Sequence, residues 1–276
     1  MIWLSTEPPP IISVTLLGWI IAILKGIQIG FIVIFGLCIL MILRCIEYPL
    51  FRNNRPITPH ITQIVCRCAL FIIGVRCRVR GHPMLRKGAM VANHSSWLDI
   101  FALNAFHNVY FVSKSEVSAW PLIGQLARAT GTVFIERNPR KAVEQRNIFQ
   151  ERLKSGHRLL FFPEGTSTDG LQVLDFKPTL FAAFFEATLK DQTHLQAVSV
   201  FYKAPKGEDL RFYGWWGDMS FAGHLLRTLA SLRHGEVHIT FSEPLAVRDF
   251  ANRKTLALAL HALVAEGHKK AMHYAQ

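Results

Sequence analysis

The chain has 276 residues, enough for one domain of ordinary size plus an appendage. Half of its residues are hydrophobic and only 18% are charged, which excludes a disordered chain. Lys and Arg outnumber Asp and Glu by 31 to 19, so the formal net charge is +12. Such a positive field favours a polyanionic neighbour: a nucleic acid, an anionic membrane surface or an acidic carrier protein.

The first strong feature is an apolar segment from Ile11 to Leu43, in which Lys25 is the single charged residue. At about 1.5 Å per residue, this segment is longer than a hydrocarbon core of about 30 Å requires. It can form one long tilted helix or two shorter helices that meet at Lys25 and Gly26. We expect a membrane anchor over residues 1–50, with its main span at about 27–43 and a shallow interfacial helix before the span.

The charge around this segment predicts its orientation. Arg44, Arg52 and Arg55 follow the segment, whereas no Lys or Arg precedes Lys25. Because basic residues accumulate on the cytoplasmic side of membrane spans, we expect the bulk of the chain to be cytoplasmic. A cleaved signal peptide is the weaker alternative, since the first residues carry Glu7 and no basic residue.

Beyond the anchor, short apolar runs alternate with longer helical patterns. The expected strands are Cys77–Arg80, Met90–Ala92, Val109–Val112, Thr132–Ile135, Arg158–Phe162, Gln196–Phe201 and Val237–Phe241. The expected helices cover residues 60–73, 97–106, 121–129, 139–155, 179–190, 221–232 and 247–273. This alternation predicts an α/β domain over residues 60–276, with a mainly parallel sheet flanked by helices.

Polar residues follow the strand Met90–Ala92 directly, beginning with Asn93 and His94. Ser95 or Ser96 can cap the following helix, which places His94 in the loop and Asp99 in the first helical turn. The Asp99 carboxylate can then orient the imidazole and stabilise its protonated form, as a general base requires. By itself this spacing is weak evidence, because it also arises by chance.

Two later strands also end in polar residues. The run Leu159–Phe162 is followed by Pro163, Glu164, Gly165, Thr166 and Ser167. Gly165 lacks a Cβ atom, so backbone N–H groups can approach a ligand there. The run Thr132–Ile135 leads to Arg137, whose guanidinium can hold an anionic group. Taken singly, these residues also fit a polar turn and a surface ion pair.

In combination, Asn93-His94 through Asp99, Gly131 through Arg137, and Phe162-Pro163-Glu164-Gly165-Thr166 resemble the glycerophospholipid acyltransferase family, which includes 1-acylglycerol-3-phosphate acyltransferases. The resemblance covers residues 60–245. It implies acyl transfer from a thioester, on coenzyme A or acyl carrier protein, to a lipid hydroxyl, with no metal or cofactor. His94 is implied as the general base and Asp99 as its orienting partner. The acceptor's polar head is implied to bind Arg137, Glu164, Gly165 and Thr166.

Two features indicate the acceptor. Ser167 stands where family members that acylate lysophosphatidic acid commonly carry Arg, so a cation that a phosphate would use is missing. Farther on, Trp215, Trp216 and Asp218 can together receive an ammonium group, although adjacent aromatic residues equally fit a core or a membrane interface. With Lys177, these stretches resemble the bacterial branch that acylates lyso-ornithine lipid.

We therefore expect a lysolipid O-acyltransferase at the bacterial inner membrane, with a cytoplasmic catalytic domain. Its expected partners are the bilayer, a lysolipid acceptor and an acyl thioester of coenzyme A or acyl carrier protein, and the product is ornithine lipid. An enzyme that makes phosphatidic acid from lysophosphatidic acid is the main alternative. A lipid hydrolase of the same fold and a basic membrane-bound binding protein are weaker ones. Nucleic acid is not expected, since the Lys and Arg residues are scattered.

Overall fold

The computed structural model describes residues 3–9, 13–136 and 142–275. Within them the strands are β1 (Arg76–Arg80), β2 (Gly88–Ala92), β3 (Tyr110–Lys114), β4 (Val133–Ile135), β5 (Leu159–Phe161), β6 (His194–Lys203), β7 (Glu236–Phe241) and β8 (Leu245–Ala246). They form one sheet in the order β1-β7-β6-β2-β5-β3-β4, with β8 paired to β6. Neighbours pair in parallel except β7 and β8 against β6. The predicted α/β fold with a mainly parallel sheet is confirmed.

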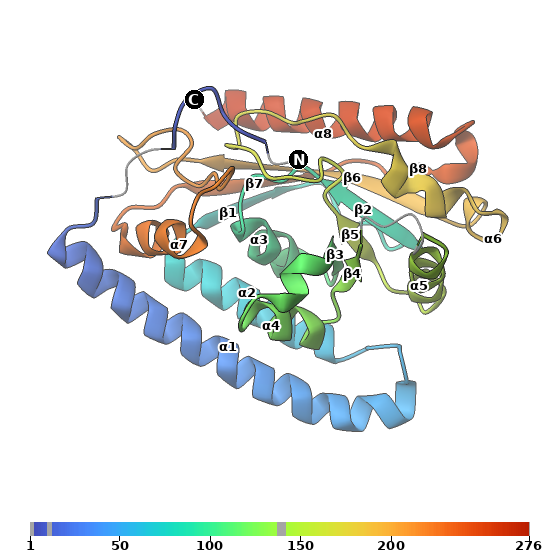
Figure 1. The fold of residues 1–276 in the computed structure, drawn as a ribbon, viewed down its shortest axis with the longest axis horizontal. Helices are drawn as coiled ribbons and strands as arrows, with labels where there is room; N and C mark the ends of the chain where they lie inside the picture. Colours follow the sequence, from blue (N-terminus) through green and yellow to red (C-terminus); the bar gives the residue numbers. More distant parts are fainter. Residues whose placement is uncertain (1–2, 10–12, 137–141, 276) are drawn as a thin grey trace.

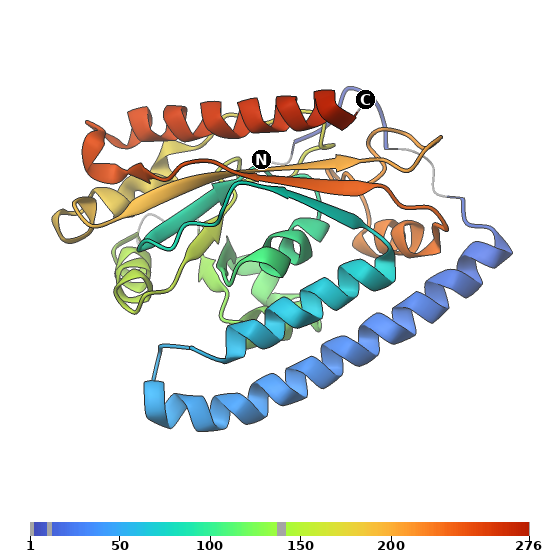
Figure 2. The same cartoon turned by 180° about the vertical axis from the view of Figure 1, so that it is seen from behind.

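Helices lie on both sides of this sheet (Figures 1 and 2). The α-helices are α1 (Leu16–Phe51), α2 (Thr58–Ile73), α3 (Leu98–Phe106), α4 (Ile123–Ala129), α5 (Ala142–Lys154), α6 (Ala187–Lys190), α7 (Phe221–Ala230) and α8 (Arg253–Ala275). Short 3-10 helices cover Ser115–Ala119, Pro178–Phe185 and Val247–Asp249.

Strand β2 shows how one sequence serves both faces of the sheet. All five of its residues are buried. Met90 and Ala92 join the core beneath α2, α3 and α7, whereas Ala89 and Val91 join the core beneath α5 and α8. Because side chains alternate across a strand, a strand that is buried on both faces reads as a continuous apolar run. The polar residues that follow β2, beginning with Asn93, can therefore reach solvent only beyond the carboxyl end of the strand.

Two expected helices are shorter than their patterns. Residues 179–190 were expected as one α-helix, but Glu186 adopts an extended conformation between a 3-10 helix and the single turn of α6. The last helix was expected from residue 247 and begins at Arg253 instead. Asn252 accounts for this start, because its Oδ1 atom accepts hydrogen bonds from the backbone N–H groups of Lys254 and Thr255.

The N-terminal apolar segment forms a single helix, α1, which continues through Lys25 and Gly26. The expected separation into an interfacial helix and a later span is therefore wrong. Lys25 fits within the helix because its ammonium donates to the carbonyl groups of Ile73 (2.8 Å) and Ser231 (3.1 Å). Ile73 is the last residue of α2, and Ser231 directly follows α7. These carbonyl groups lie at the negative ends of the two helix dipoles.

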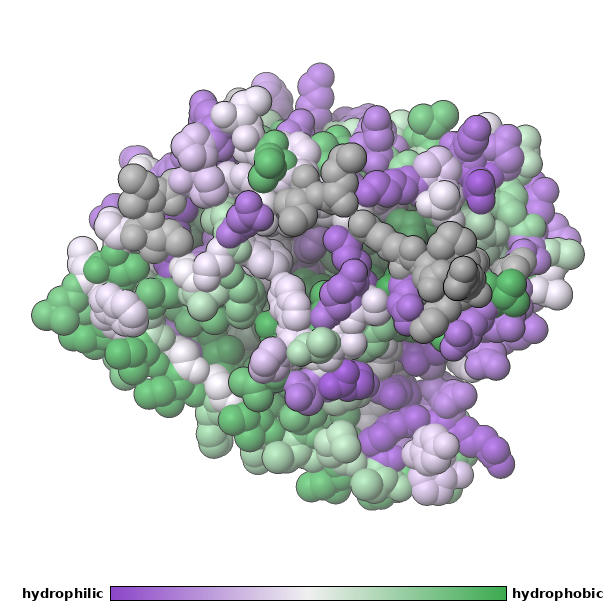
Figure 3. Space-filling model, in the orientation of Figure 1, coloured by the Kyte–Doolittle hydropathy of each residue, from purple (hydrophilic) through white to green (hydrophobic). Residues whose placement is uncertain are grey.

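Helix α1 packs against α2 and α7 and leaves much of its apolar surface exposed. Gly36 allows a close approach to α2, since a Cβ atom there would lie 2.4 Å from a methyl carbon of Val65. On the outer side, residues such as Phe31 and Ile34 are about two-thirds exposed. Figure 3 shows hydrophobic residues gathered along this helix. By length and composition α1 can cross a membrane, and it suggests association of the protein with one.

Candidate active site

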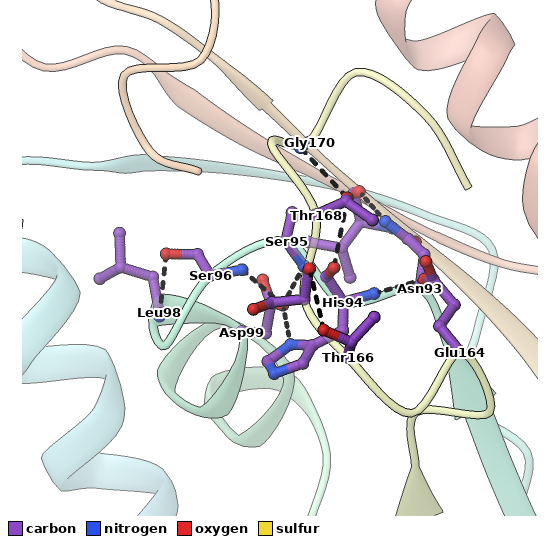
Figure 4. Close-up of polar contacts among 12 residues, drawn as sticks. Asn93, His94, Ser95, Ser96, Leu98, Asp99, Glu164, Thr166, Thr168 and Gly170 are labelled. Carbon is purple, nitrogen blue, oxygen red and sulfur yellow. Dashed lines mark hydrogen bonds and ion pairs between the residues drawn. The ribbon is translucent and has the colours of Figure 1, made fainter. Parts of the chain in front are cut away.

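Strands β2 and β5 bring two loops together at one edge of the sheet. They are parallel neighbours, and Val91 of β2 pairs with Phe161 of β5. Because parallel strands end at the same edge, the loop that begins at Asn93 lies beside the loop that begins at Phe162. Figure 4 shows residues of both loops in one site.

The His94 imidazole faces the Asp99 carboxylate, with Nδ1 of His94 2.7 Å from Oδ2 of Asp99. The same oxygen accepts hydrogen bonds from the backbone N–H groups of Ser95 (2.9 Å) and Ser96 (3.1 Å), and the Asp99 side chain is fully buried. Since an ionised carboxylate only accepts, the neutral imidazole carries its proton on Nδ1. Nε2 is then free to take a proton from a ligand. The two side chains meet as the sequence predicted.

Glu164 fixes the backbone of this site and does not project into open space. One carboxylate oxygen accepts from the backbone N–H of His94 (2.8 Å), and the other accepts from the N–H of Leu174 (2.9 Å). The residue is only 2% exposed. Burial raises the pKa of the Glu164 carboxyl to about 8, because desolvation outweighs the effect of the two donors. Glu164 is expected to hold the acceptor's head, and in the structure both of its carboxylate oxygens accept backbone N–H groups.

The loop after β5 holds His94 at two further points. The backbone N–H of Thr168 donates to the carbonyl oxygen of His94 at 2.9 Å. The Phe162 ring stacks on the imidazole, with the ring centroids 4.1 Å apart and the planes 14° from parallel. Together with Asp99 and Glu164, these contacts fix both the backbone and the ring of His94. The imidazole remains 20% exposed, so a ligand can reach it.

The remaining predicted residues of this loop form a turn around Gly165, which has a positive φ of 72°. A Cβ atom at Gly165 would lie 2.6 Å from Nζ of Lys177, so the lysine side chain lies directly against the glycine. Thr166 and Ser167 are half-buried in the same turn, and the hydroxyl of Thr166 lies 3.4 Å from the carbonyl oxygen of Ser167. The turn thus gathers one cation and two hydroxyls next to the His94 loop.

The aromatic stretch after β6 adjoins the same site. The backbone N–H of Trp215 donates to the carbonyl oxygen of Ser95 at 2.8 Å, which ties this stretch to the His94 loop. The indole N–H of Trp215 donates to the carbonyl oxygen of Met219, and the Trp216 side chain is buried. Asp218 is exposed. The structure therefore places the two tryptophans as the frame of this loop and leaves the carboxylate of Asp218 open to a ligand.

One predicted site residue, Arg137, lies outside the described residues. Among the described ones, no group of three or more His, Cys, Asp or Glu side chains is arranged to hold a metal ion.

Two contributions to the site were missed by the sequence analysis. Tyr202 is buried on β6, and burial together with the neighbouring Asp99 carboxylate raises the pKa of its phenol well above the usual range. Behind the loop, the indole N–H of Trp97 donates to Nδ1 of the fully buried His224 at 2.8 Å. Tyr202 and His224 lie more than a hundred residues along the chain from Asp99 and Trp97. The one signal in the sequence is that each is a polar side chain within an apolar run.

Comparisons with known proteins identify the family of this chain. The model of the acyltransferase family matches residues 76–200, which include both loops. The chain is 53% identical over 266 residues to the lyso-ornithine lipid O-acyltransferase of Rhodobacter capsulatus, covering 96% of each chain. It is 36% identical over 203 residues to the enzyme of that name from Rhizobium meliloti, covering 69% of this chain and 68% of the relative.

More distant similarities point to the same fold. A 1-acyl-sn-glycerol-3-phosphate acyltransferase of Neisseria gonorrhoeae is 42% identical over 111 residues, or 40% of this chain and 42% of the relative. The crystal structure of the 1-acyl-sn-glycerophosphate acyltransferase PlsC from Thermotoga maritima superposes with a TM-score of 0.58 at 20% identity. That superposition covers 90% of this chain and 98% of PlsC. The chain is a lysolipid acyltransferase, and it belongs to the family that contains the bacterial lyso-ornithine lipid O-acyltransferases.

Proposed function

We propose that this protein transfers a fatty acyl group from a thioester donor to the free hydroxyl of lyso-ornithine lipid, forming ornithine lipid. The observation that carries the proposal is similarity over nearly the whole chain to an enzyme named for this acceptor. Relatives named for 1-acyl-sn-glycerol-3-phosphate match a smaller part of the chain, 40% in the Neisseria enzyme. Ser167 supports the same choice, because a hydroxyl there offers a phosphate no positive charge.

His94 acts as the general base in this proposal. Its free Nε2 atom takes the proton of the acceptor hydroxyl while the hydroxyl oxygen attacks the thioester carbonyl carbon. The carbon–oxygen bond forms, the carbon–sulfur bond breaks, and the proton passes from the imidazolium to the departing thiolate. Asp99 stabilises the imidazolium through the 2.7 Å contact with Nδ1. Since the thioester is already activated, the reaction requires no covalent enzyme intermediate, metal or cofactor.

The acceptor headgroup carries an ammonium and a carboxylate. Asp218 is the proposed partner of the ammonium, with Trp215 and Trp216 beside it. The proposed partners of the carboxylate are Arg137 and Lys177, the cations that come after β4 and β5 in the sequence. Gly165, Thr166 and Ser167 are proposed to form the wall of the headgroup site next to Lys177.

The donor and the location belong to the same proposal. Acyl carrier protein or coenzyme A supplies the thioester, and the net charge of +12 suits either of these acidic carriers. Both the acceptor and the product partition into a bilayer, so the enzyme must meet them there. The exposed apolar surface of α1 supports attachment to the bacterial inner membrane, with the catalytic domain on the cytoplasmic side. Because α1 packs along α2 and α7, and the segment before α1 contacts the same domain as the segment after it, this helix is proposed to lie along the membrane surface.

An acceptor panel tests the proposal. Purified protein is offered lyso-ornithine lipid or lysophosphatidic acid, each with acyl carrier protein and coenzyme A thioesters, and the acylated product is quantified. We expect efficient transfer to lyso-ornithine lipid and loss of that transfer in the His94→Ala variant. Preferential formation of phosphatidic acid would overturn the assigned acceptor. Release of fatty acid without any lysolipid would instead indicate a hydrolase.

A further inference from the structure

The segment that precedes α1, residues 3–9, lies against the active-site loops. The backbone N–H of Trp3 donates to the hydroxyl of Thr166 at 3.3 Å. The hydroxyl of Ser5 donates to the carboxylate of Asp169 at 3.4 Å. Both partners belong to the loop after β5 that holds His94. The N-terminal segment, dark blue in Figure 1, is therefore part of the surroundings of the site.

The same segment also contacts the aromatic stretch after β6. A Cβ atom at Gly217 would lie 3.1 Å from a methyl carbon of Leu4, so the leucine packs directly on this glycine. Glu7 forms an ion pair with Arg211 at 3.2 Å. The segment thus bridges two loops that lie about 50 residues apart in the chain, the loop around Thr166 and the loop around Gly217.

Between this segment and the aromatic stretch lies an open pocket of about 520 Å³. The N-terminal side of the pocket is Leu4, Ser5, Glu7, Pro8 and Pro9, and the opposite side is residues 216–220. Its volume falls in the range of about 300–1,000 Å³ that small-molecule sites occupy. The N-terminal segment supplies half of the lining, so without it this pocket would be an open surface.

The lining of the pocket favours a cation on an apolar stem. Its charged residues are Glu7 and Asp218, and the described lining includes no Lys, Arg or His, although the whole chain carries a net charge of +12. Asp218 has no hydrogen-bond or ion-pair partner among the described residues. Leu4, Trp216 and Met219 supply apolar walls, which suit methylene groups. A phosphate group would be repelled by the carboxylate of Asp218, whereas the charge of Glu7 is already paired with Arg211.

The pocket lies within reach of the reacting hydroxyl. The hydrogen bond from Trp215 to Ser95 joins the aromatic stretch to the catalytic loop at 2.8 Å. Trp216, which lines the pocket, directly follows the donor Trp215, and His94 directly precedes the acceptor Ser95. Consecutive Cα atoms are about 3.8 Å apart, so the pocket and His94 are close to each other. A headgroup several bonds long can therefore place its amine in the pocket and its hydroxyl at His94.

We propose that residues 3–9 form the outer wall of the acceptor's headgroup site, and that the pocket behind them binds the side-chain ammonium and methylene groups of the ornithine headgroup. The inference rests on the proposed function, which supplies the cationic acceptor. It adds the N-terminal segment, which is separate in the chain from the catalytic loops, as a determinant of acceptor recognition.

The test compares initial rates for three acceptors: lyso-ornithine lipid, its analogue with an acetylated side-chain amine, and lysophosphatidic acid. The variants are deletion of residues 3–9, Glu7→Gln and Asp218→Asn, with Glu266→Gln on α8 as the matched control for removal of an exposed carboxylate. We expect the deletion and Asp218→Asn to raise KM for lyso-ornithine lipid about tenfold, as the loss of one charge-assisted contact predicts. The kcat and the KM for the thioester should stay within about twofold, and Glu7→Gln should shift KM in the same direction.

The acetylated analogue gives the second readout. Wild-type protein should bind it about tenfold more weakly than lyso-ornithine lipid, and Asp218→Asn should cause no further loss, because the charge pair is already absent. Unchanged KM for lyso-ornithine lipid in both the deletion and the point variants would overturn the inference and leave the proposed function intact. A wild-type protein that acylates lysophosphatidic acid and ignores lyso-ornithine lipid would overturn both. If the deletion lowers the Tm, the two point variants decide the outcome.

Discussion

Glu164 and His94 lie 70 positions apart in the chain, yet a carboxylate oxygen of Glu164 accepts the backbone N–H of His94 at 2.8 Å. The second oxygen accepts the N–H of Leu174 at 2.9 Å, so one buried side chain satisfies two loop N–H groups. Backbone N–H groups that are shielded from water need a partner, and here a single carboxyl accepts from two of them. The loop that carries His94 and the loop that follows β5 therefore form one unit.

Replacing Glu164 with Ala should weaken both folding and catalysis. The variant leaves the backbone N–H groups of His94 and Leu174 without these acceptors, and both hydrogen bonds are partly buried, which predicts a loss of about 1–3 kcal/mol in the free energy of unfolding. The kcat should also fall, because the loop that orients His94 loses a support. Denaturant unfolding and initial rates measure the two effects, with Glu243→Ala as the exposed control. A stable variant with wild-type kcat would contradict the positioning role.

Replacing His94 with Ala should lower kcat by about 10²–10⁴-fold, the usual contribution of a general base. Asp99→Asn should also lower kcat, because the neutral amide no longer stabilises the imidazolium. The KM for the acceptor should change little in both variants. His273→Ala, at an exposed position of α8, is the control. Transfer at the wild-type rate by His94→Ala would exclude the base assignment.

Stability should fall in acid through His224. Burial lowers the pKa of His224 to about 4 from an ordinary value of 6.5. The unfolded chain therefore binds a proton on this residue between pH 6.5 and 4 while the folded chain does not. This contribution to stability is complete above pH 6.5 and is lost as the pH falls toward 4, by at most about 3 kcal/mol.

Denaturant titrations across this pH range, on wild type and His224→Gln, check the prediction. The variant should show a smaller decrease in unfolding free energy between pH 7 and 4.5. Equal decreases in the two proteins would show that His224 becomes protonated without unfolding the chain.

Replacing Gly165 with Ala should strain the turn against Lys177. The positive φ of 72° costs a residue with a side chain about 1–2 kcal/mol, and the added methyl group displaces the lysine ammonium. Gly207→Ala is a matched control, since its φ is 88° and nothing lies within 4 Å of an added Cβ atom. Both variants should lose similar stability in thermal unfolding. Only Gly165→Ala should raise the KM for the acceptor, and an equal KM in both would argue against a role of this turn in binding.

Several features could be predicted from the sequence because they depend on local pattern. Apolar runs such as Leu159–Phe161 identified the strands, and the spacing of His94 and Asp99 predicted that the two side chains meet. The expected serine cap is met only in part, because the N-cap residue of α3 is Trp97 and the Ser96 hydroxyl accepts the backbone N–H of Leu98 at 3.3 Å. The long apolar stretch identified α1, but it could not show that Lys25 stays within the helix. That outcome depends on the carbonyl groups at the ends of α2 and α7, which the Lys25 ammonium contacts only in the folded chain.

The amino-acid sequence by itself determined the fold class, the two polar loops and the pairing of His94 with Asp99, because each depends on residues close together in the chain. Tertiary structure alone decided that Glu164 supports the backbone of His94, that His224 accepts the Trp97 N–H, and that residues 3–9 line a pocket beside the site. These contacts join segments tens to more than a hundred residues apart. Burial and the need to satisfy buried hydrogen-bonding groups determine which residues become partners, and a local sequence pattern does not show this.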